Sequence, residues 1–404
     1  MNILVVQETN WLEKFPFEPH HMFEILSMRG HKITVIDYED HWKRREASDY
    51  GKLQTAVYEK VEKLYSGASV TVRRPGMIKI PGLSRLSASL THTFEILRTL
   101  TEDVDVVVLY SVPTNGLQAL VAGKILDARI VFHSLDVLHE VVRPRILRLP
   151  TLVLENMIYR YVDRIIAITP GLAEYVQMQG AKANKVVMIP AGVDVERFNP
   201  KVDGNDVRER FGIADDEKVV LFTGWLYDFS GLDLIVEAMP KIIEEVQKMR
   251  LVIVGEGPLS SKLQSLVKKL DLGSRVLLLG RQPYSLIPKF MAASDVCINP
   301  FKPNEVSKNA FPVKVLEYMA SGKSTVASRL PGTEAILGED SGTVLVENEE
   351  FVDKLIEILK DEQLIKELGE KSRKTVEEKF SYDKITDRFE RILLEVAKHD
   401  VYIK

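Results

Sequence analysis

The sequence has little cysteine, little net charge and no long apolar run. Its 404 residues include one cysteine, Cys297, so an intrachain disulfide is excluded and a reducing, cytoplasmic location is expected. The formal net charge of −4 is not the basic surplus of a nucleic-acid-binding protein, and we expect no nucleic-acid partner. No apolar run approaches the roughly 20 residues of a membrane-spanning helix, and the first residues lack the pattern of a signal peptide.

Three further observations limit the classes of protein to which the chain can belong. Residues Gln7 to Asn10, after the first apolar run, contain no Gly-x-Gly-x-x-Gly, which disfavours a nicotinamide-dependent dehydrogenase, a class that also uses doubly wound domains. No group of His and Asp residues has the spacing of metal ligands, and we expect no metal. Cys297 stands in the apolar run Val296–Ile298, which favours a position in the core over a role as nucleophile.

Short β-branched runs alternate with longer helical patterns, which is typical of parallel sheets joined by crossover helices. In the first half, strands are expected at residues 3–6, 32–36, 106–110, 129–133, 164–169 and 186–189. A second series is expected at residues 219–222, 251–254, 276–279, 296–299, 324–327 and 343–346. The polar stretch Pro200–Asn205, which also contains glycine, separates the two series and is the predicted linker.

The chain is too long for one core, so two α/β domains are predicted, each Rossmann-like and doubly wound. They are expected at residues 1–200 and 206–380. Residues 381–404 are predicted to form a helix that packs back on the first domain, because its apolar residues form one stripe: Ile385, Phe389, Ile392, Leu393 and Val396. Such sheets bind ligands at the carboxyl ends of their strands, so a cleft between the facing domains is the expected site.

A helix started by proline is predicted at residues 312–320, with Lys314 in its first turn. A cation is unfavourable at the positive end of a helix dipole. A bound anion would reverse this, because free N–H groups and the dipole both favour phosphate. Glu317 lies on the same face as Lys314 and could accept hydrogen bonds from ribose hydroxyls. An exposed Lys–Glu pair on an ordinary helix is the alternative interpretation.

Several short motifs occur in one order over nearly the whole chain. They are Gly30-His31, Val131–Asp136, Pro190–Asp194 with Phe198–Pro200, Thr223–Leu226 before Gly231–Leu234, Val254–Pro258, Leu279–Arg281 and the Glu317 helix. Together they resemble the retaining glycosyltransferases of family 4, which have the GT-B fold. The resemblance implies a metal-independent hexosyltransferase that uses a UDP- or GDP-sugar as donor, needs no cofactor and retains the anomeric configuration.

The resemblance also implies roles for single residues. His133 matches the histidine beside the donor sugar, with a histidine that caps a buried strand end as the alternative. Glu317 matches the second acid of a two-acid motif, which holds the ribose. Arg281 and Glu256 follow strands near the nucleotide, although a solvated arginine and a tight turn explain them equally well. The other expected donor contacts are Gly224, Phe311, Pro312 and Val313.

The chain departs from the family pattern where the diphosphate should bind. The family's arginine and lysine align with Trp225 and Ser230, and the first acid of the motif is Asn309, which offers hydrogen bonds but no charge. Positive groups at a leaving diphosphate usually supply the largest catalytic term, so we expect Lys314 to replace them. The second candidates are Lys308 and the start of the 231–246 helix. A non-catalytic protein that binds nucleotide sugars is the alternative function.

The acceptor, a sugar or a lipid-linked molecule, is expected in the first domain. The loop after the first strand contains Trp11, and His20 opens the next helix; sugar-stacking residues or a plain core edge would both give this pattern. Asp136 could bind the acceptor or orient His133, with a structural loop aspartate as the alternative. No Asp or Glu in the motifs occupies an evident nucleophile position, so retention is expected through departure and attack on one face.

Two arginine-rich stretches suggest a peripheral contact with anionic lipid at the inner face of a membrane. Residues 72–86 contain no acid and four cations: Arg73, Arg74, Lys79 and Arg85. In the second stretch three arginines alternate with apolar residues: Arg143, Arg145 and Arg148. Solvated side chains that lie along apolar surface are the alternative.

Overall fold

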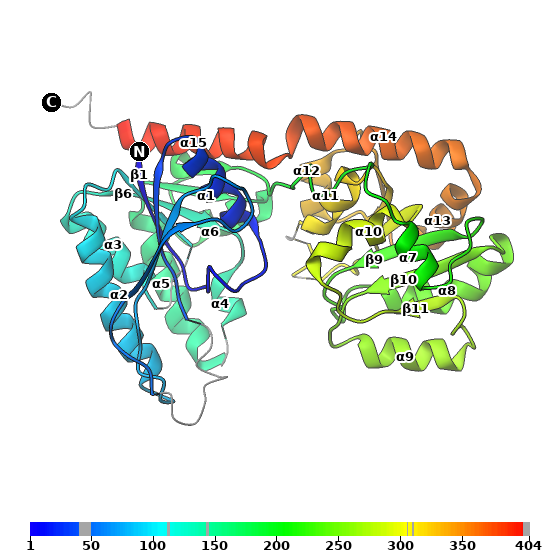
Figure 1. The fold of residues 1–404 in the computed structure, drawn as a ribbon, viewed down its shortest axis with the longest axis horizontal. Coiled ribbons are helices and arrows are strands. Elements are labelled where there is room, and N and C mark those ends of the chain that lie inside the picture. The colour runs from blue at the N-terminus through cyan, green and yellow to red at the C-terminus, as the bar shows by residue number, and fades with distance from the viewer. Residues whose placement is uncertain (40–49, 111–113, 143–144, 305, 309–310, 399–404) are drawn as a thin grey trace. The chain divides into compact units, whose positions relative to one another are not determined.

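The computed structural model describes residues 1–404 except 40–49, 111–113, 143–144, 305, 309–310 and 399–404. The chain divides by its internal contacts into two units (Figure 1). Unit 1 consists of Met1–Pro190 and Ile385–Lys404, and unit 2 of Ala191–Lys384. Each unit is built on a largely parallel sheet with helices, so the predicted α/β class is confirmed.

The units divide before the predicted linker at residues 200–205. Ala191, Val193 and Phe198 pack in a core with Val219 and Leu221, which belong to the second sheet. Val193 also forms a bridge with Ser381. Apolar packing therefore assigns the segment just after Pro190 to unit 2, although the polar composition of the chain changes later.

The sheet of unit 1 has eight strands among the described residues, in the order β3-β4-β2-β1-β5-β6-β7-β8. The strands are β1 (Asn2–Val6), β2 (Lys32–Ile36), β3 (Ala56–Val61), β4 (Val70–Arg74), β5 (Val106–Leu109), β6 (Arg129–Ser134), β7 (Arg164–Ala167) and β8 (Val186–Met188). All neighbours pair in parallel except β3 and β4. The central strands are apolar throughout because helices bury both faces.

The edge pair β3–β4 was not predicted, and it changes the interpretation of the first arginine-rich stretch. Arg73 pairs with Glu95 at 2.9 Å, Arg74 with Asp37 at 2.5 Å and Lys79 with Glu39 at 2.7 Å. These three cations are largely buried, so they do not form the free basic patch that the sequence suggested. The acids that pair with them are distant in sequence, and local composition does not reveal them.

The helices of unit 1 are α1 (Glu18–Met28), α2 (Ser84–Leu100), α3 (Gly116–Ile125), α4 (Leu138–Val141), α5 (Arg148–Tyr161), α6 (Pro170–Met178) and most of α15 (Tyr382–Lys398). Residues of α2, α3 and α5 share one core with strands β1, β5 and β6. The Phe389 ring of α15 lies 5.9 Å from the Phe23 ring of α1, and Arg29 pairs with Asp387 and Glu390. The end of the chain thus completes unit 1, as Figure 1 shows in red beside α1.

Unit 2 has a parallel sheet of six strands among its described residues, in the order β11-β10-β9-β12-β13-β14. The strands are β9 (Lys218–Thr223), β10 (Met249–Val254), β11 (Val276–Leu278), β12 (Val296–Asn299), β13 (Ser324–Ser328) and β14 (Thr343–Val346). Its helices are α7 (Asn205–Arg210), α8 (Leu232–Glu245), α9 (Ser260–Lys269), α10 (Ile287–Ala292), α11 (Val313–Ala320), α12 (Pro331–Leu337), α13 (Phe351–Lys360) and α14 (Glu362–Lys379).

The strand order reverses once in each sheet. In unit 1 the chain moves outward from β1 through β2 and then returns to β5, on the other side of β1. In unit 2 it moves outward from β9 through β10 to β11 and returns to β12. The loops diverge at such a reversal and leave a crevice at the carboxyl ends of the strands. Each unit therefore has one topologically favoured place for a ligand.

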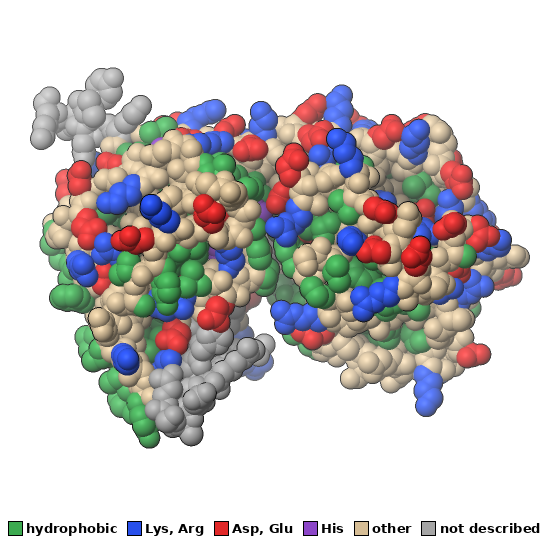
Figure 2. Space-filling view, in the orientation of Figure 1, with side chains coloured by type: hydrophobic (Ala, Val, Ile, Leu, Met, Phe, Trp, Pro, Cys, Tyr) green, Lys and Arg blue, Asp and Glu red, His purple; other side chains and the backbone are tan. Residues whose placement is uncertain are grey.

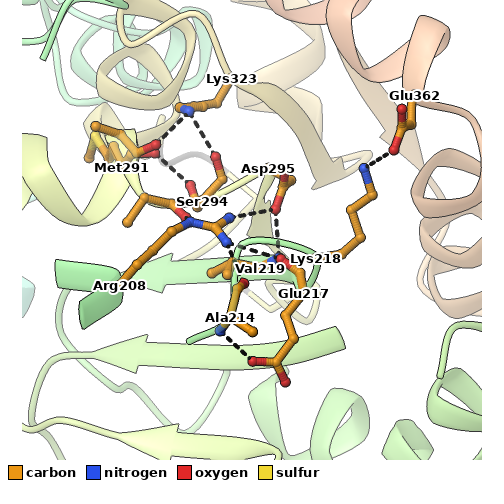
Figure 3. A network of polar contacts seen from close by, with 12 residues as sticks. Arg208, Ala214, Glu217, Lys218, Val219, Met291, Ser294, Asp295, Lys323 and Glu362 are labelled. Carbon is orange, nitrogen blue, oxygen red and sulfur yellow. Dashed lines mark hydrogen bonds and ion pairs between the residues drawn. The ribbon is translucent and has the colours of Figure 1, made fainter. Parts of the chain in front are cut away.

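A polar network ties the opposite, amino-terminal edge of the unit 2 sheet (Figure 3). The Asp295 carboxylate accepts hydrogen bonds from the Val219 N–H at 2.7 Å and from the Arg208 guanidinium at 3.2 Å. Lys323 donates to the carbonyl oxygens of Ala292 and Ser294 at 3.1 and 2.7 Å. The network joins α7 to the starts of β9, β12 and β13, and it lies at the edge opposite the strand ends where the ligand is expected.

We expect Asp295→Ala to lower the free energy of unfolding of the protein by about 2–3 kcal/mol, because a charge-assisted bond and a backbone bond are lost. Urea denaturation measures this. Asp216→Ala is the matched control, since Asp216 pairs with Lys248 at the exposed surface, where ion pairs add little to stability. Equal losses for the two variants would contradict the assignment.

Candidate functional site

Three loops at the carboxyl edge of the unit 2 sheet are joined backbone to backbone. The Gly224 N–H donates to the Val254 carbonyl at 2.9 Å, and the Gly255 N–H donates to the Gly280 carbonyl at 2.8 Å. A Cβ at Gly255, whose φ is +156°, would lie 1.8 Å from the Gly224 carbonyl oxygen. Glycine is therefore required for the β9 and β10 loops to approach this closely. These three joined loops form the floor of the site, to which Gly224 contributes its backbone.

Helix α11 begins above this floor, at the reversal between β9 and β12. The helix starts at Val313, with Pro312 as its N-cap residue and no side-chain cap, one residue later than predicted. The Tyr318 hydroxyl accepts a hydrogen bond from the Thr223 N–H at 2.8 Å, which anchors α11 to the end of β9. Among the described residues, no hydrogen bond is formed by the first-turn N–H groups of Val313 and Lys314. The start of α11 is thus open to an anion.

Lys314 extends over the same floor. Its Nζ atom lies 4.0 Å from the centroid of the Phe222 ring and 5.0 Å from that of Phe301. A Cβ added at Gly224 would lie only 2.7 Å from this nitrogen. The ammonium makes no hydrogen bond or ion pair within the described part of the chain. Two aromatic faces stabilise it in part, but burial still lowers its pKa to about 7, against an attraction to Glu317 that raises it.

Glu317 lies beside Lys314 on α11, and burial raises its pKa to about 7. Its Oε1 accepts a hydrogen bond from the Tyr284 hydroxyl at 3.4 Å. The Arg197 guanidinium lies over the Tyr284 ring, 5.2 Å from its centroid. A half-buried carboxylate and a half-buried amine, each with few protein partners, thus both have pKa values near neutral pH. The sequence did not identify Tyr284, since its contact with Glu317 depends on the fold.

The other predicted donor residues are less enclosed. Glu256 and Arg281 approach each other at 3.7 Å, and both side chains are exposed. Phe311 is buried, Pro312 is buried and Val313 is 39% exposed, so of these three only Val313 can offer both an N–H group and an accessible side chain. Asn309 lies outside the described residues.

Trp225 and Ser230, which stand where the family has its two cations, differ in solvent exposure. Trp225 is 49% exposed beside Gly224, whereas Ser230 is buried with no partner for its hydroxyl among the described residues. The first turn of α8 holds Asp233, which receives hydrogen bonds from Lys262 at 2.5 Å and Lys302 at 2.8 Å. The second candidate for the diphosphate, the start of this helix, thus already carries a carboxylate.

A cavity of about 700 Å³ lies in unit 1 at the reversal between β1 and β5. Its polar wall contains Glu8, Lys14, His133 and Asp136, and burial raises the pKa of Asp136. The apolar wall is formed by residues of the β6 end, of α4 and α5, and of the segments that flank α4: Phe132, Leu135, Leu138, Val142, Leu147, Pro150 and Leu154. The cavity can accept a ligand with a polar end and an apolar part.

His133 is buried at the end of β6, at the base of this cavity. Its Nδ1 atom lies 2.8 Å from the Tyr110 hydroxyl, and its Nε2 atom lies 3.2 Å from Oε1 of Glu18. Burial lowers the pKa of His133 to about 3 and raises that of Glu18 to about 8. Both groups are therefore uncharged at pH 7. The sequence did not identify Glu18, which is distant from His133 along the chain.

Trp11 and His20, the other two expected acceptor residues, pack together in the interior, with ring centroids 4.2 Å apart. The His20 Nε2 atom bonds to the Trp11 carbonyl at 2.9 Å, and the Trp11 N–H donates to Asp37 at 3.0 Å. Neither residue lines the cavity. The loop after β1 is thus held by a buried polar core, which is a structural role.

Comparison with protein families matches both parts of the chain. Residues 20–197 match the model of Glycosyltransferase Family 4, and residues 203–375 match that of Glycosyl transferases group 1. The first match covers most of unit 1 and extends to residue 197 in unit 2, and the second lies within unit 2. The chain therefore belongs to the group 1 glycosyltransferases, which confirms the resemblance drawn from its motifs.

Individual relatives and solved structures agree with this assignment. N-acetyl-alpha-D-glucosaminyl L-malate synthase of Bacillus anthracis is 30% identical over 54% of this chain and 56% of its own. A GDP-mannose-dependent phosphatidylinositol monomannoside mannosyltransferase of Corynebacterium glutamicum is 30% identical over 51% and 55%. The chain thus spans about half the length of the curated relatives it matches. HepE of Anabaena, solved with UDP, has a TM-score of 0.73 at 18% identity and matches 98% of this chain and 100% of its own, which shows the GT-B fold.

We expect Glu18→Gln to change how stability depends on pH. The pKa of Glu18 rises from its ordinary value of 4.5 to about 8 on folding. The folded state then holds more protons between these values, so the stability of the wild type falls as pH rises through this window. Glutamine removes this loss. The variant should gain at least about 1.4 kcal/mol relative to wild type between pH 5 and pH 8.5.

Urea denaturation at the two pH values measures the effect. Glu59→Gln, at an exposed position on β3, is the control and should leave the pH dependence unchanged. If the Glu18 variant keeps the same pH dependence as the wild type, the protonation state assigned to the buried pair is wrong.

Proposed function

We propose that this protein transfers a hexosyl unit from a nucleotide-diphosphate sugar to an acceptor, with retention of the anomeric configuration. The observation that carries the proposal is the Lys314 amine, which has no hydrogen-bond or ion-pair partner among the described residues and lies beside the open start of α11. An amine and free N–H groups at one point form a site for a diphosphate. Lys314 thereby takes the place of the two missing family cations.

The neighbouring residues fit the rest of a nucleotide sugar. The Glu317 carboxylate is positioned to accept hydrogen bonds from ribose hydroxyls, and the backbone near Gly280 and Arg281 follows a strand end where a base can pack. HepE has been solved with UDP and with UDP-glucose, whereas the relative from Corynebacterium glutamicum is GDP-mannose-dependent. UDP- and GDP-sugars are therefore the donors to test.

We assign the acceptor to the cavity of unit 1. HepE has also been solved with UDP and glucose together, and the phosphatidylinositol-based relative acts on a lipid. In this chain the cavity combines carboxylates with an apolar wall, so a sugar hydroxyl would lie near Asp136 and a lipid portion would contact the leucines. A sugar carried on a lipid satisfies both walls.

The proposed step breaks the bond between the anomeric carbon and the diphosphate oxygen and forms a bond from that carbon to the acceptor oxygen. Departure and attack occur on the same face, so configuration is retained. A β-phosphate oxygen takes the proton of the acceptor hydroxyl. Charge develops on the departing diphosphate, and the charged form of Lys314 with the N–H groups of α11 stabilises it.

A non-catalytic sugar-nucleotide-binding protein is the second candidate, favoured by Trp225 and Ser230 at the positions of the two family cations. Binding and turnover separate the two functions. Release of free nucleoside diphosphate from the donor, measured with extracts or defined glycans as acceptors, supports the enzyme. Donor binding without release or transfer for every acceptor supports the second candidate.

The pKa of Lys314 predicts that donor binding takes up a proton. At pH 8 the amine is mostly neutral, because its pKa in the free protein is about 7. A bound diphosphate favours the charged form and raises this pKa, so binding weakens as pH rises above 7. Calorimetric titration with UDP and GDP at pH 8, in buffers of different ionisation enthalpy, should show uptake of up to about one proton for the nucleotide that binds.

Lys314→Met should abolish this uptake and weaken binding by about tenfold or more, the order expected for a lost charge-assisted contact. The variant should remain folded, because methionine removes a desolvated amine and keeps its apolar contacts. Lys289→Met, which breaks an exposed pair with Asp206, is the control. Undiminished binding and uptake in the Lys314 variant would exclude the proposed diphosphate site.

A further inference from the structure

Helix α2 carries its apolar stripe on the side that faces water. Five apolar residues at helical spacing, from the N-cap residue to the last turn, are exposed: Leu83, Leu86, Leu90, Phe94 and Leu97. Leu90 is 74% exposed and Phe94 is 69% exposed. A surface helix of a globular protein normally turns such a stripe toward the core. Here the stripe is available to something outside the unit.

The buried side of α2 is the more polar one. It includes Ser87, His92, Glu95 and Thr99. His92 bonds to the carbonyls of Ala88 and Asp37 at 2.7 and 3.1 Å, and Glu95 accepts a hydrogen bond from Thr55 at 2.9 Å. These bonds fix the rotation of the helix about its axis. Turning the apolar stripe inward would leave buried polar groups without hydrogen-bond partners.

Two neighbouring helices extend this surface. Helix α3 packs against both α2 and α5 and exposes Val121 and Ile125. Helix α5 and the turn before it expose a second stripe: Ile146, Leu149, Val153, Met157 and Tyr161. Figure 2 shows hydrophobic side chains gathered along the edge of unit 1 where Figure 1 places α2 and α3. We call these exposed residues of the three helices and their flanking turns the α2–α3–α5 surface.

Within the three helices themselves, the charges at the surface have one sign. The three helices contain two acids, Glu95 and Glu155, and both are buried. Their five cations lie wholly or partly at the surface: Arg85, Arg98, Lys124, Arg148 and Arg160. Apolar side chains among long cationic ones match a bilayer with anionic headgroups, because the chains enter the interface while the cations remain at the phosphates.

The surface is continuous with the cavity proposed for the acceptor. Leu86 and Leu147 are both exposed and line the cavity, as do Arg85 and Ser89 of α2. The cavity therefore reaches water between the start of α2 and the start of α5, which is the edge of the exposed apolar stripes. A lipid leaving a bilayer at this edge would pass apolar side chains along its whole route.

We infer that the α2–α3–α5 surface docks the protein on an anionic lipid bilayer and presents the cavity of unit 1 to a lipid-borne acceptor. Docking is peripheral: within the described residues, no helix has the length and apolarity to cross a membrane. The inference about the acceptor rests on the proposed function, whereas docking itself does not. Docking uses exposed arginines and apolar stripes, not the paired cations of residues 73–79.

The test is flotation of the full chain with vesicles of phosphatidylglycerol and phosphatidylcholine, and with vesicles of phosphatidylcholine alone. Binding should be strong on the anionic vesicles and weak on the neutral ones. Leu90→Glu and Phe94→Glu should each lower the partition coefficient at least about tenfold, since each places a charge where an apolar side chain enters the interface. Neither residue lines the cavity. Met178→Glu, on α6, is the matched control because Met178 is also 69% exposed in unit 1.

Three results would overturn docking. The first is no flotation with either vesicle, and the second is an equal loss of vesicle binding in Met178→Glu. The third is binding that disappears in high salt and is unchanged by Leu90→Glu and Phe94→Glu. A dimer in sedimentation that Phe94→Glu dissociates, without vesicle binding, would assign the surface to a second copy of the chain. The vesicles contain no donor. Calorimetric titration of the same variants with UDP and GDP therefore reports the proposed function separately.

Discussion

The hydrogen bond from the Thr223 N–H to the Tyr318 hydroxyl fixes the start of α11 at the end of β9. Gly224 and Gly255 complete this arrangement, because only residues without a side chain let the β9 and β10 loops lie so close. Lys314 can then extend across Gly224 to the Phe222 ring. The chemistry proposed for unit 2 follows from this one backbone-to-side-chain contact, since a shift of α11 would move the amine and the open N–H groups together.

Burial changes the charge of the ionisable groups differently in the unit 2 site and in the unit 1 cavity. In unit 2, burial weakens the charge on both Lys314 and Glu317 and leaves each ready to be recharged by a ligand. In unit 1, burial keeps Glu18 and His133 neutral beside each other, so the base of the cavity presents hydrogen-bonding groups without net charge. The unit 2 site carries a cost in stability that a bound anion can relieve at Lys314, whereas in unit 1 the buried, protonated Glu18 carries a cost in stability that increases as pH rises.

Sequence patterns predicted the central strands and the helices between them, since continuous apolar runs such as Val106–Leu109 are typical of strands buried on both faces. They missed β3, whose residues are mostly exposed, and α14, whose outer face is highly charged. The motifs indicated Lys314 and Glu317 because both lie on one short helix. They did not predict Glu18, Tyr284 or the partners of Arg73, because these contacts join distant segments and only the fold brings them together.

The return of the last helix to the first sheet has a consequence for the order of assembly. Unit 2 is inserted within unit 1, since Ile385–Lys404 complete a unit that begins at Met1. On the ribosome, all of unit 2 is synthesised before Phe389, whose ring packs against those of Phe23 and His133. Until then the Phe23 and His133 rings lack this packing partner, so the packing of unit 1 is completed only after unit 2 has been synthesised.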